Sequence, residues 1–178
     1  MNAPIGRTVL LSGVDLGPTG SVSTFNESAL PKGGQLGQIY ESNGKFYRLV
    51  KFDNGSAVAS AAGNAAYWKT KSSYIVTSDE SDSEGTNAAG NNAVAGGFLG
   101  VLTDLNYGFI QMGGDQAGVL VDATAAAGDM LSGGNTDGTL VITAAGTAGG
   151  PVNMLVAIAT AADVALRAPV RWEFGTMV

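Results

Sequence analysis

Short runs of β-favouring residues, separated by glycine-containing turns, make up most of this sequence and constrain its fold more than any other feature. The clearest turn is Asn43-Gly44, which separates the runs 38–42 and 45–52. Both central residues of a two-residue hairpin turn need positive φ, which asparagine and glycine adopt readily. The spacing therefore predicts a hairpin in which Tyr40 lies opposite Tyr47, a favourable aromatic pair.

The rest of the chain repeats this pattern and predicts an all-β protein. Further expected strands are 67–69, 74–77, 98–103, 107–112, 118–122, 129–131, 139–142, 152–158 and 170–174. Many short strands at even spacing are typical of a small β-barrel or sandwich. Residues 78–92 are polar and rich in small residues, which predicts an exposed loop. The alanine-rich run 57–66 favours a helix by propensity, but Gly63-Asn64 argues against a long one, and 161–167 is expected to form one helical turn.

Two four-residue segments resemble each other. Ala61-Ala62-Gly63-Asn64 follows the first hairpin, and Ala126-Ala127-Gly128-Asp129 follows a later expected β-ribbon. A duplicated β unit explains the likeness, and so does chance in a chain with 27 glycines. The sequence leaves both explanations open.

Residues 1–34 differ from the remainder and predict an extended N-terminal arm before a β-domain at 35–178. Glycines and prolines break the segment repeatedly, yet apolar residues such as Ile5, Val9, Leu10 and Leu11 are scattered through it. A solvated linker rarely carries so many apolar residues, whereas an arm that lies on a neighbouring surface needs them. An ordinary disordered terminus is the alternative.

Composition excludes several kinds of chemistry. The chain has no Cys and no His, which excludes disulfides, thiol nucleophiles, Cys/His zinc sites and histidine acid–base catalysis. Its net charge of −6 would repel a phosphate backbone, so we expect no nucleic-acid partner. Only 13% of the residues are charged, about half the usual share, which indicates surface that is covered by other chains.

The sequence contains no sign of a membrane span or a secretion signal. No apolar run approaches the length of about 18 residues that a transmembrane helix needs. The first residues lack a basic region followed by a long apolar stretch, so we expect synthesis in a cytoplasm and no membrane partner.

Two local patterns suggest chemistry but have simpler explanations. Ser42-Asn43-Gly44-Lys45 fits the S-x-x-K pattern of serine acyl enzymes, which works at a helix start and not in a hairpin turn. The acidic run 79–84 places carboxylates at alternate positions, as in a calcium loop, but Asn91 stands where the bidentate Glu is needed. We therefore expect no catalytic residues, no bound metal and no cofactor, and interpret 79–84 as a solvated loop.

An ordered set of motifs resembles the capsid decoration proteins of tailed bacteriophages, also called cement or head-stabilising proteins. The most distinctive are Asn106-Tyr107-Gly108-Phe109 and Ala126-Ala127-Gly128-Asp129-Met130-Leu131. The weaker ones are Leu36-Gly37-Gln38-Ile39-Tyr40, Gly44-Lys45-Phe46-Tyr47-Arg48-Leu49-Val50, Gly100-Val101-Leu102-Thr103 and Leu155-Val156-Ala157-Ile158-Ala159. The resemblance covers roughly residues 35–175.

The resemblance implies a non-enzymatic β-rich protein on the outer surface of an icosahedral head, often a homotrimer, with the major capsid protein as its partner. It assigns no capsid-contact residues. From the arm and the last expected strand we take as candidate contacts Ile5, Arg7, Val9, Leu10, Leu11, Arg171 and Trp172. The aromatic residues, Trp172 among them, are expected in the core or at a subunit interface. The alternative function is a tail- or fibre-associated module that binds host-surface glycans.

Overall fold

The computed structural model describes residues 35–84, 93–134, 136–142 and 156–173 of the 178-residue chain. Within these ranges the regular elements are strands, apart from the 3₁₀ helix η2 (Lys71–Ser73). The strands are β1 (Ile39–Ser42), β2 (Lys45–Phe52), β3 (Ala65–Thr70), β4 (Ile75–Thr77), β5 (Val94–Phe98), β6 (Tyr107–Leu120), β7 (Met130–Gly133), β8 (Leu140–Ile142), β9 (Val156–Ala159) and β10 (Arg167–Glu173). The predicted all-β fold is confirmed, whereas the arm predicted at 1–34 lies outside the described residues.

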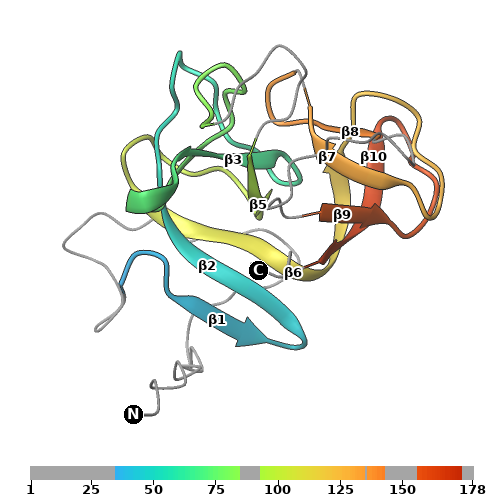
Figure 1. The fold of residues 1–178 in the computed structure, drawn as a ribbon, viewed down its shortest axis with the longest axis horizontal. Helices are drawn as coiled ribbons and strands as arrows, with labels where there is room; N and C mark the ends of the chain where they lie inside the picture. Colours follow the sequence, from blue (N-terminus) through green and yellow to red (C-terminus); the bar gives the residue numbers. More distant parts are fainter. Residues whose placement is uncertain (1–34, 85–92, 135, 143–155, 174–178) are drawn as a thin grey trace.

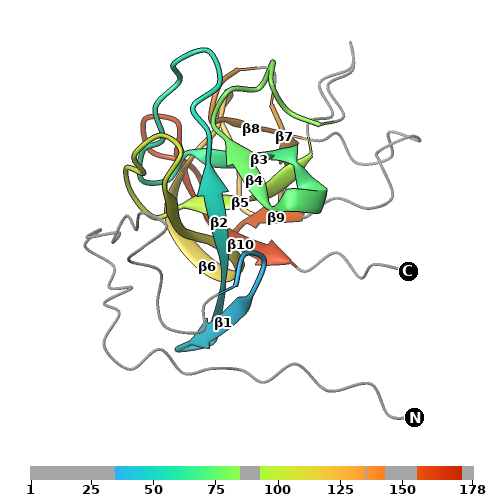
Figure 2. The same cartoon turned by 90° about the vertical axis from the view of Figure 1, so that its left-hand side faces the viewer.

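Five strands close into a barrel, which confirms that part of the predicted fold class. Their order is β2-β4-β3-β5-β6, and antiparallel pairing of β6 with β2 closes the ring. Strand β1 extends the barrel as an edge strand on β2 (Figures 1 and 2). The apolar side chains that fill the barrel are Val50, Phe52, Ala66, Trp68, Val76, Ala95, Phe98, Leu102 and Ile110.

A second ring is built on the far half of β6. Strands β6, β10, β9, β7 and β8 follow one another through antiparallel pairs. An isolated parallel bridge between Val121, directly after β6, and Leu140 of β8 joins the two ends of this row. The fourteen-residue strand β6 is thus a wall of both rings, and Figure 1 shows it curving from one half of the molecule into the other.

The predicted hairpin is confirmed residue by residue. Tyr40 pairs with Tyr47 across β1 and β2. Asn43 and Gly44 have φ values of 52° and 74°, the positive values that a two-residue turn of this kind requires. The ring of Tyr40 also lies 5.2 Å from that of Phe109, edge to face, and so attaches the edge strand to β6.

The two similar four-residue segments form the same turn. In Ala61–Asn64 and in Ala126–Asp129 the fourth N–H donates to the first carbonyl, at 3.0 and 3.1 Å. In both turns the N–H of the glycine donates to the carbonyl of the last residue of a strand. The N–H of that strand residue donates to the carbonyl of the residue after the glycine. That strand residue is Phe98 of β5 in the first copy and Ala159 of β9 in the second, with bonds of 2.8 to 3.0 Å.

The likeness extends to the strands around these turns. Asp53, directly after β2, donates its N–H to Val76 at 2.9 Å, and Asp122, just beyond β6, donates to Leu140 at 3.0 Å. Each bond lies at a parallel contact between strands of a ring: β2 with β4 in the first ring, and Val121 with Leu140 in the second. In both copies the strand after the turn pairs antiparallel with the next two strands. This repeated hydrogen-bond pattern favours duplication of a β unit over chance, with β6 common to both copies.

Two predictions along the middle of the chain are corrected by the structure: the place of one strand and the separation of two others. The strand expected at 98–103 is β5 at Val94–Phe98, because Gly96 lies inside the strand and not in a turn. A Cβ on Gly96 would lie 2.2 Å from the carbonyl oxygen of Gln111, so only glycine allows β6 to approach this closely. The strands expected at 107–112 and 118–122 are one strand, β6, which bends through a bulge without ending.

The remaining differences concern helices and exposure. The described structure has no helix at 57–66 or at 161–167; the first region contains the Ala61–Asn64 turn, and β10 begins at Arg167. The run 78–84, part of the expected exposed loop, buries Ser78, Asp79 and Ser83. Hydrogen bonds within the chain compensate this burial at Asp79, as described below. Residues 85–92 lie outside the described residues.

Two buried glutamines organise β6 where it passes from the first ring to the second. The side-chain amide of Gln111 donates to the carbonyls of Gly113, Gly114 and Asp115 at 3.1, 3.1 and 3.0 Å. Gln116 donates to the carbonyl of Phe98 at 3.0 Å and accepts the indole N–H of Trp172 at 2.7 Å. These bonds connect β5, β6 and β10 in the interior.

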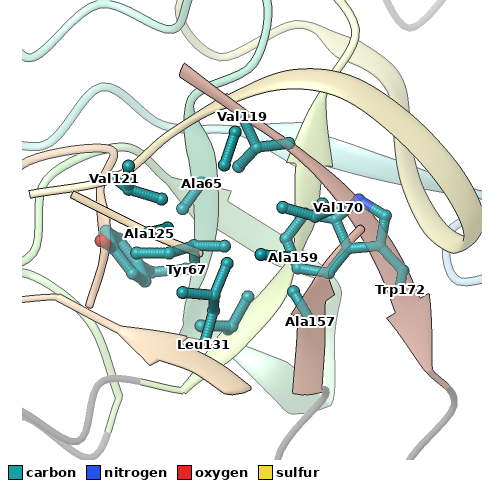
Figure 3. Close-up of a cluster of buried hydrophobic side chains, with 13 residues drawn as sticks. Ala65, Tyr67, Val119, Val121, Ala125, Leu131, Ala157, Ala159, Val170 and Trp172 are labelled. Atoms are coloured by element: carbon teal, nitrogen blue, oxygen red, sulfur yellow. The ribbon is translucent and has the colours of Figure 1, made fainter. Parts of the chain in front are cut away.

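The largest apolar cluster occupies the second ring (Figure 3). Tyr67 reaches into it from β3 of the first ring, and its hydroxyl donates to the carbonyl of Thr139. Trp172 lies at the other side of the cluster and is 2% exposed. Burial of large aromatic side chains from both rings in one cluster holds the two halves together.

Replacement of Gly44 with Val is expected to destabilise the protein by about 1–2 kcal/mol. Nothing lies within 4 Å of a Cβ built on Gly44, so the cost comes from the φ of 74° and not from a clash. Gly44→Asn is the matched control, because asparagine tolerates positive φ. Urea unfolding measures both variants; equal stability of Gly44→Val and wild type would contradict the turn assignment.

Replacement of Gln116 with Leu is expected to lower the free energy of unfolding by about 1–3 kcal/mol. The change leaves the indole N–H of Trp172 buried without its partner and removes one of the two hydrogen bonds that the carbonyl of Phe98 accepts, while the bond from the N–H of Gly63 stays. Asp115→Asn at the neighbouring position alters an exposed ion pair with Arg171, which contributes little. Chemical denaturation compares the two variants, and a Gln116→Leu protein as stable as Asp115→Asn would show that this bridge is dispensable.

Candidate functional site

The two described candidate contacts, Arg171 and Trp172, point to opposite sides of β10. Arg171 is exposed, and its guanidinium donates to both carboxylate oxygens of Asp115 at 2.8 and 3.3 Å. This pairing holds the pKa of Asp115 below its usual value and raises that of Arg171. Trp172 is enclosed in the core, so of this pair only Arg171 displays its side chain at the surface. The candidates Ile5, Arg7, Val9, Leu10 and Leu11 lie outside the described residues.

Exposed apolar side chains gather in two topologically equivalent loops that sequence reasoning did not single out. Val101 and Leu105, between β5 and β6, are 66% and 55% exposed. Val164 and Leu166, between β9 and β10, are 78% and 43% exposed. Both leucines have a φ of 59°, unusual for a bulky side chain. The backbone of each loop therefore holds an aliphatic side chain outward at a conformational cost.

The carboxylates at the start of the acidic run are bonded to groups of the protein itself. Asp79 accepts hydrogen bonds from the N–H of Ser56 at 3.0 Å and from the N–H and hydroxyl of Ser81 at 2.9 and 2.6 Å. Asp82 and Asp53 both bind the ammonium of Lys69, at 3.0 and 2.9 Å. Among the described residues, no group of three or more His, Cys, Asp or Glu side chains is arranged to hold a metal ion.

These contacts set the pKa values of the two carboxyl groups. Burial alone would raise the pKa of Asp53, but hydrogen bonds from Lys69 and from the N–H of Gly55 outweigh it and leave the pKa low. Burial likewise opposes the shift at Asp79, where the bonds from Ser81 and Ser56 lower the pKa. Both groups are therefore held as carboxylates: Asp53 fastens the segment after β2 to Lys69 of β3, and Asp79 connects Ser56 with Ser81.

Ser42 and Lys45, the ends of the S-x-x-K match, pair with each other across the hairpin. They occupy the last residue of β1 and the first residue of β2, as the hairpin prediction implies. The helix start at which the S-x-x-K pattern operates in acyl enzymes is not the setting of these residues.

Arg48, which has no hydrogen bond or ion pair with the described residues, lies at the end of the first barrel where β2 and β4 begin and β3 ends. Arg48 is two residues before Val50 on β2 and so shares its inward side. The central carbon of its guanidinium lies 5.7 Å from the ring centre of Trp68 and 5.9 Å from that of Tyr74. The ring centres of Trp68 and Tyr74 lie 6.3 Å apart, with an angle of 65° between the ring planes. Arg48 is part of the motif at 44–50, but the sequence assigned no function to its side chain.

The ring of Tyr74 is held in place by its backbone and by a glycine. Tyr74 has the left-handed angles φ 54° and ψ 38°, directly after η2. A Cβ on Gly37 would lie 2.2 Å from the ring carbon Cζ, so the ring rests directly on Gly37. A bulky residue with strained backbone angles beside a half-buried arginine is an arrangement that occurs at functional sites.

Comparisons with family models, with curated proteins and with solved structures give no match for this chain. In the part of the chain that the structure describes, no helix has the length and apolar character to span a membrane.

Stability is expected to stay level between about pH 6 and 8 and to fall as the pH drops from about 5 to 3. The chain has no histidine to titrate near neutrality. Asp53 and Asp79 have lowered folded-state pKa values, so the unfolded chain binds their protons more tightly. Their contribution is therefore complete above the unfolded pKa and disappears as the pH falls through the folded one.

Thermal melting across this pH range measures the effect, with Asp79→Asn as the test variant and the exposed Asp122→Asn as its control. Asp79→Asn is expected to melt lower at pH 7 and to show a shallower fall in acid. Identical acid profiles for the two variants would mean that the bonds to Asp79 carry none of the pH dependence.

Proposed function

We propose that this protein is a structural capsid decoration protein that binds the outer surface of a bacteriophage head and stabilises contacts between major capsid subunits. The observation that carries the proposal is the pair of equivalent loops with exposed Val101, Leu105, Val164 and Leu166. Aliphatic side chains in solvent gain free energy when another surface covers them. A protein with two such loops suits a role between neighbouring subunits.

The motifs behind the resemblance to decoration proteins support the same proposal. Asn106-Tyr107-Gly108-Phe109 begins β6, the strand common to both rings. Ala126–Asp129 forms the repeated turn before β7. These motifs thus belong to the framework of the fold, and a shared framework is what such a resemblance would reflect.

The proposal includes partners and location. The major capsid protein is the partner, and a homotrimer is the assembly that decorates the shell. Net charge of −6 disfavours contact with packaged DNA and agrees with a position on the outer face of the virion. The protein would be made in the host cytoplasm and added to the head there.

Co-sedimentation with heads that lack the protein tests this function. Wild type is expected to bind, and Leu105→Asn or Leu166→Asn to bind about 5–30-fold more weakly, because each loses an aliphatic contact of about 1–2 kcal/mol. Asparagine tolerates the positive φ at these positions, so the fold is retained. Met130→Ser, an exposed apolar residue on β7 outside both loops, is the matched control.

Two outcomes would contradict the proposal. Wild type that fails to sediment with heads but binds host-surface glycans would favour the tail- or fibre-associated module instead. Equal binding by wild type, both loop variants and Met130→Ser would remove the loops as the contact surface and, with them, the observation on which the proposal rests.

A further inference from the structure

Arg48 is a half-buried cation whose hydrogen-bonding capacity the described protein does not use. Its Nε is buried and has no hydrogen-bond partner. Within the part of the chain that the structure describes, its guanidinium makes no hydrogen bond or ion pair and lies beside two aromatic rings, those of Trp68 and Tyr74. Burial lowers the pKa of Arg48 from its usual value, and the charge of Tyr74 opposes this shift. A guanidinium carries five N–H donors, and leaving the buried Nε–H unpaired costs free energy.

The duplicated unit provides an internal comparison for this arginine. Arg48 pairs with Ile110 of β6 in the first copy, and Gln116 pairs with Val170 of β10 at the corresponding place in the second. Gln116 uses both ends of its amide inside the protein, as donor and as acceptor. The same inward position therefore makes two interior hydrogen bonds in one copy and, among the described residues, none in the other.

The aromatic neighbours of Arg48 also lack counterparts in the second copy. Trp68 pairs with Val76, and Gly133 pairs with Leu140 at the equivalent place. Tyr74 and Gly138 each stand two residues before these partners, and both have positive φ. Glycine takes this conformation without strain, whereas tyrosine takes it at a cost. The strained tyrosine and the tryptophan are thus features of the Arg48 end alone and not requirements of the fold.

The chemistry of the cluster selects the ligand. A single guanidinium matches one carboxylate, which it binds through two parallel N–H···O bonds in the plane of its fork. A phosphate polyanion would need several cations and would be repelled by the net charge of −6. Trp68 and Tyr74, whose ring centres lie 6.3 Å from each other, place two adjacent aromatic faces beside the guanidinium, and this apolar surface strengthens a charged contact made there.

We propose that Arg48, flanked by Trp68 and Tyr74, is a binding site for a carboxylate group presented by a partner polypeptide. The identity of the partner, an acidic residue of a capsid subunit, rests on the proposed function. The binding of a carboxylate at Arg48 does not depend on it. Because the two apolar loops are equivalent, they alone would let the protein bind its partner in two orientations. The carboxylate site lies on the first ring only and therefore selects one of them.

The binding chemistry is tested on the isolated full-length protein by NMR. Sodium acetate is titrated against sodium chloride at constant ionic strength, with sodium phosphate as a second probe, while the Nε–H signals of Arg48 and Trp68 are followed. The chain has two tryptophans, and Trp172, whose indole is bonded to Gln116, is the internal reference. Saturable shifts at Arg48 and Trp68 with acetate, and none at Trp172, are expected.

Variants identify the residue responsible. Arg48→Gln is expected to weaken acetate binding at least about tenfold, and Arg48→Lys to have an intermediate effect because it keeps the charge but loses the fork. Arg171→Gln removes an exposed arginine elsewhere and is expected to bind as wild type does. Absence of saturable shifts in wild type, or unchanged binding by Arg48→Gln, would overturn the proposal and leave Arg48 as a structural cation–π contact.

Sedimentation with heads then tests the partner. Arg48→Gln is expected to bind about tenfold more weakly than Arg171→Gln. If acetate binds at Arg48 but Arg48→Gln sediments like wild type, the partner assignment is wrong. If acetate binds at Arg48 while wild type itself fails to sediment with heads, the proposed function fails and the carboxylate site stands.

Discussion

The rest of the structure depends on the buried amide of Gln111, which stabilises the bend where β6 leaves the first ring and enters the second. Its donors bond the carbonyls of Gly113, Gly114 and Asp115, three successive groups of its own strand. At this place the pairing of β6 with β2 shifts register and the pairing of β6 with β10 begins, so the Gln111 amide supports the strand where it changes partners. One side chain thus permits a continuous strand to serve as a wall of two rings.

Local rules predicted those parts of the fold that local interactions decide. The Asn43-Gly44 hairpin, with Tyr40 opposite Tyr47, follows from turn chemistry within ten residues of chain, and the structure confirms it. The position of β5 and the continuity of β6 depend on contacts between distant residues, namely Gly96 against the Gln111 carbonyl and the Gln111 amide against the bulge. Turn propensity alone treats such glycines as breaks, which explains both errors.

The candidate site was harder to predict than the fold. Period-two alternation along β2 places Arg48 on the same side as Val50, but a charged residue in a hairpin is ordinarily assigned to solvent. The exposure of Leu105 and Leu166 follows from positive φ at leucine, for which no sequence signal exists. Most predicted contacts lie in residues 1–34, outside the described residues, and Trp172 of β10 serves the core.

Adjacent residues of β3 show why the two copies have different roles. Tyr67 faces away from the first ring and completes the core of the second, where its hydroxyl bonds the Thr139 carbonyl. Trp68 faces the interior of the first ring and forms one wall beside Arg48. The second ring uses its inward polar position, Gln116, to bind the carbonyl of Phe98 and the indole of Trp172, so that side chain serves the interior of the fold. The polar and aromatic side chains of the second ring thus stabilise the fold, whereas Trp68 and Arg48 of the first ring are available for the proposed site.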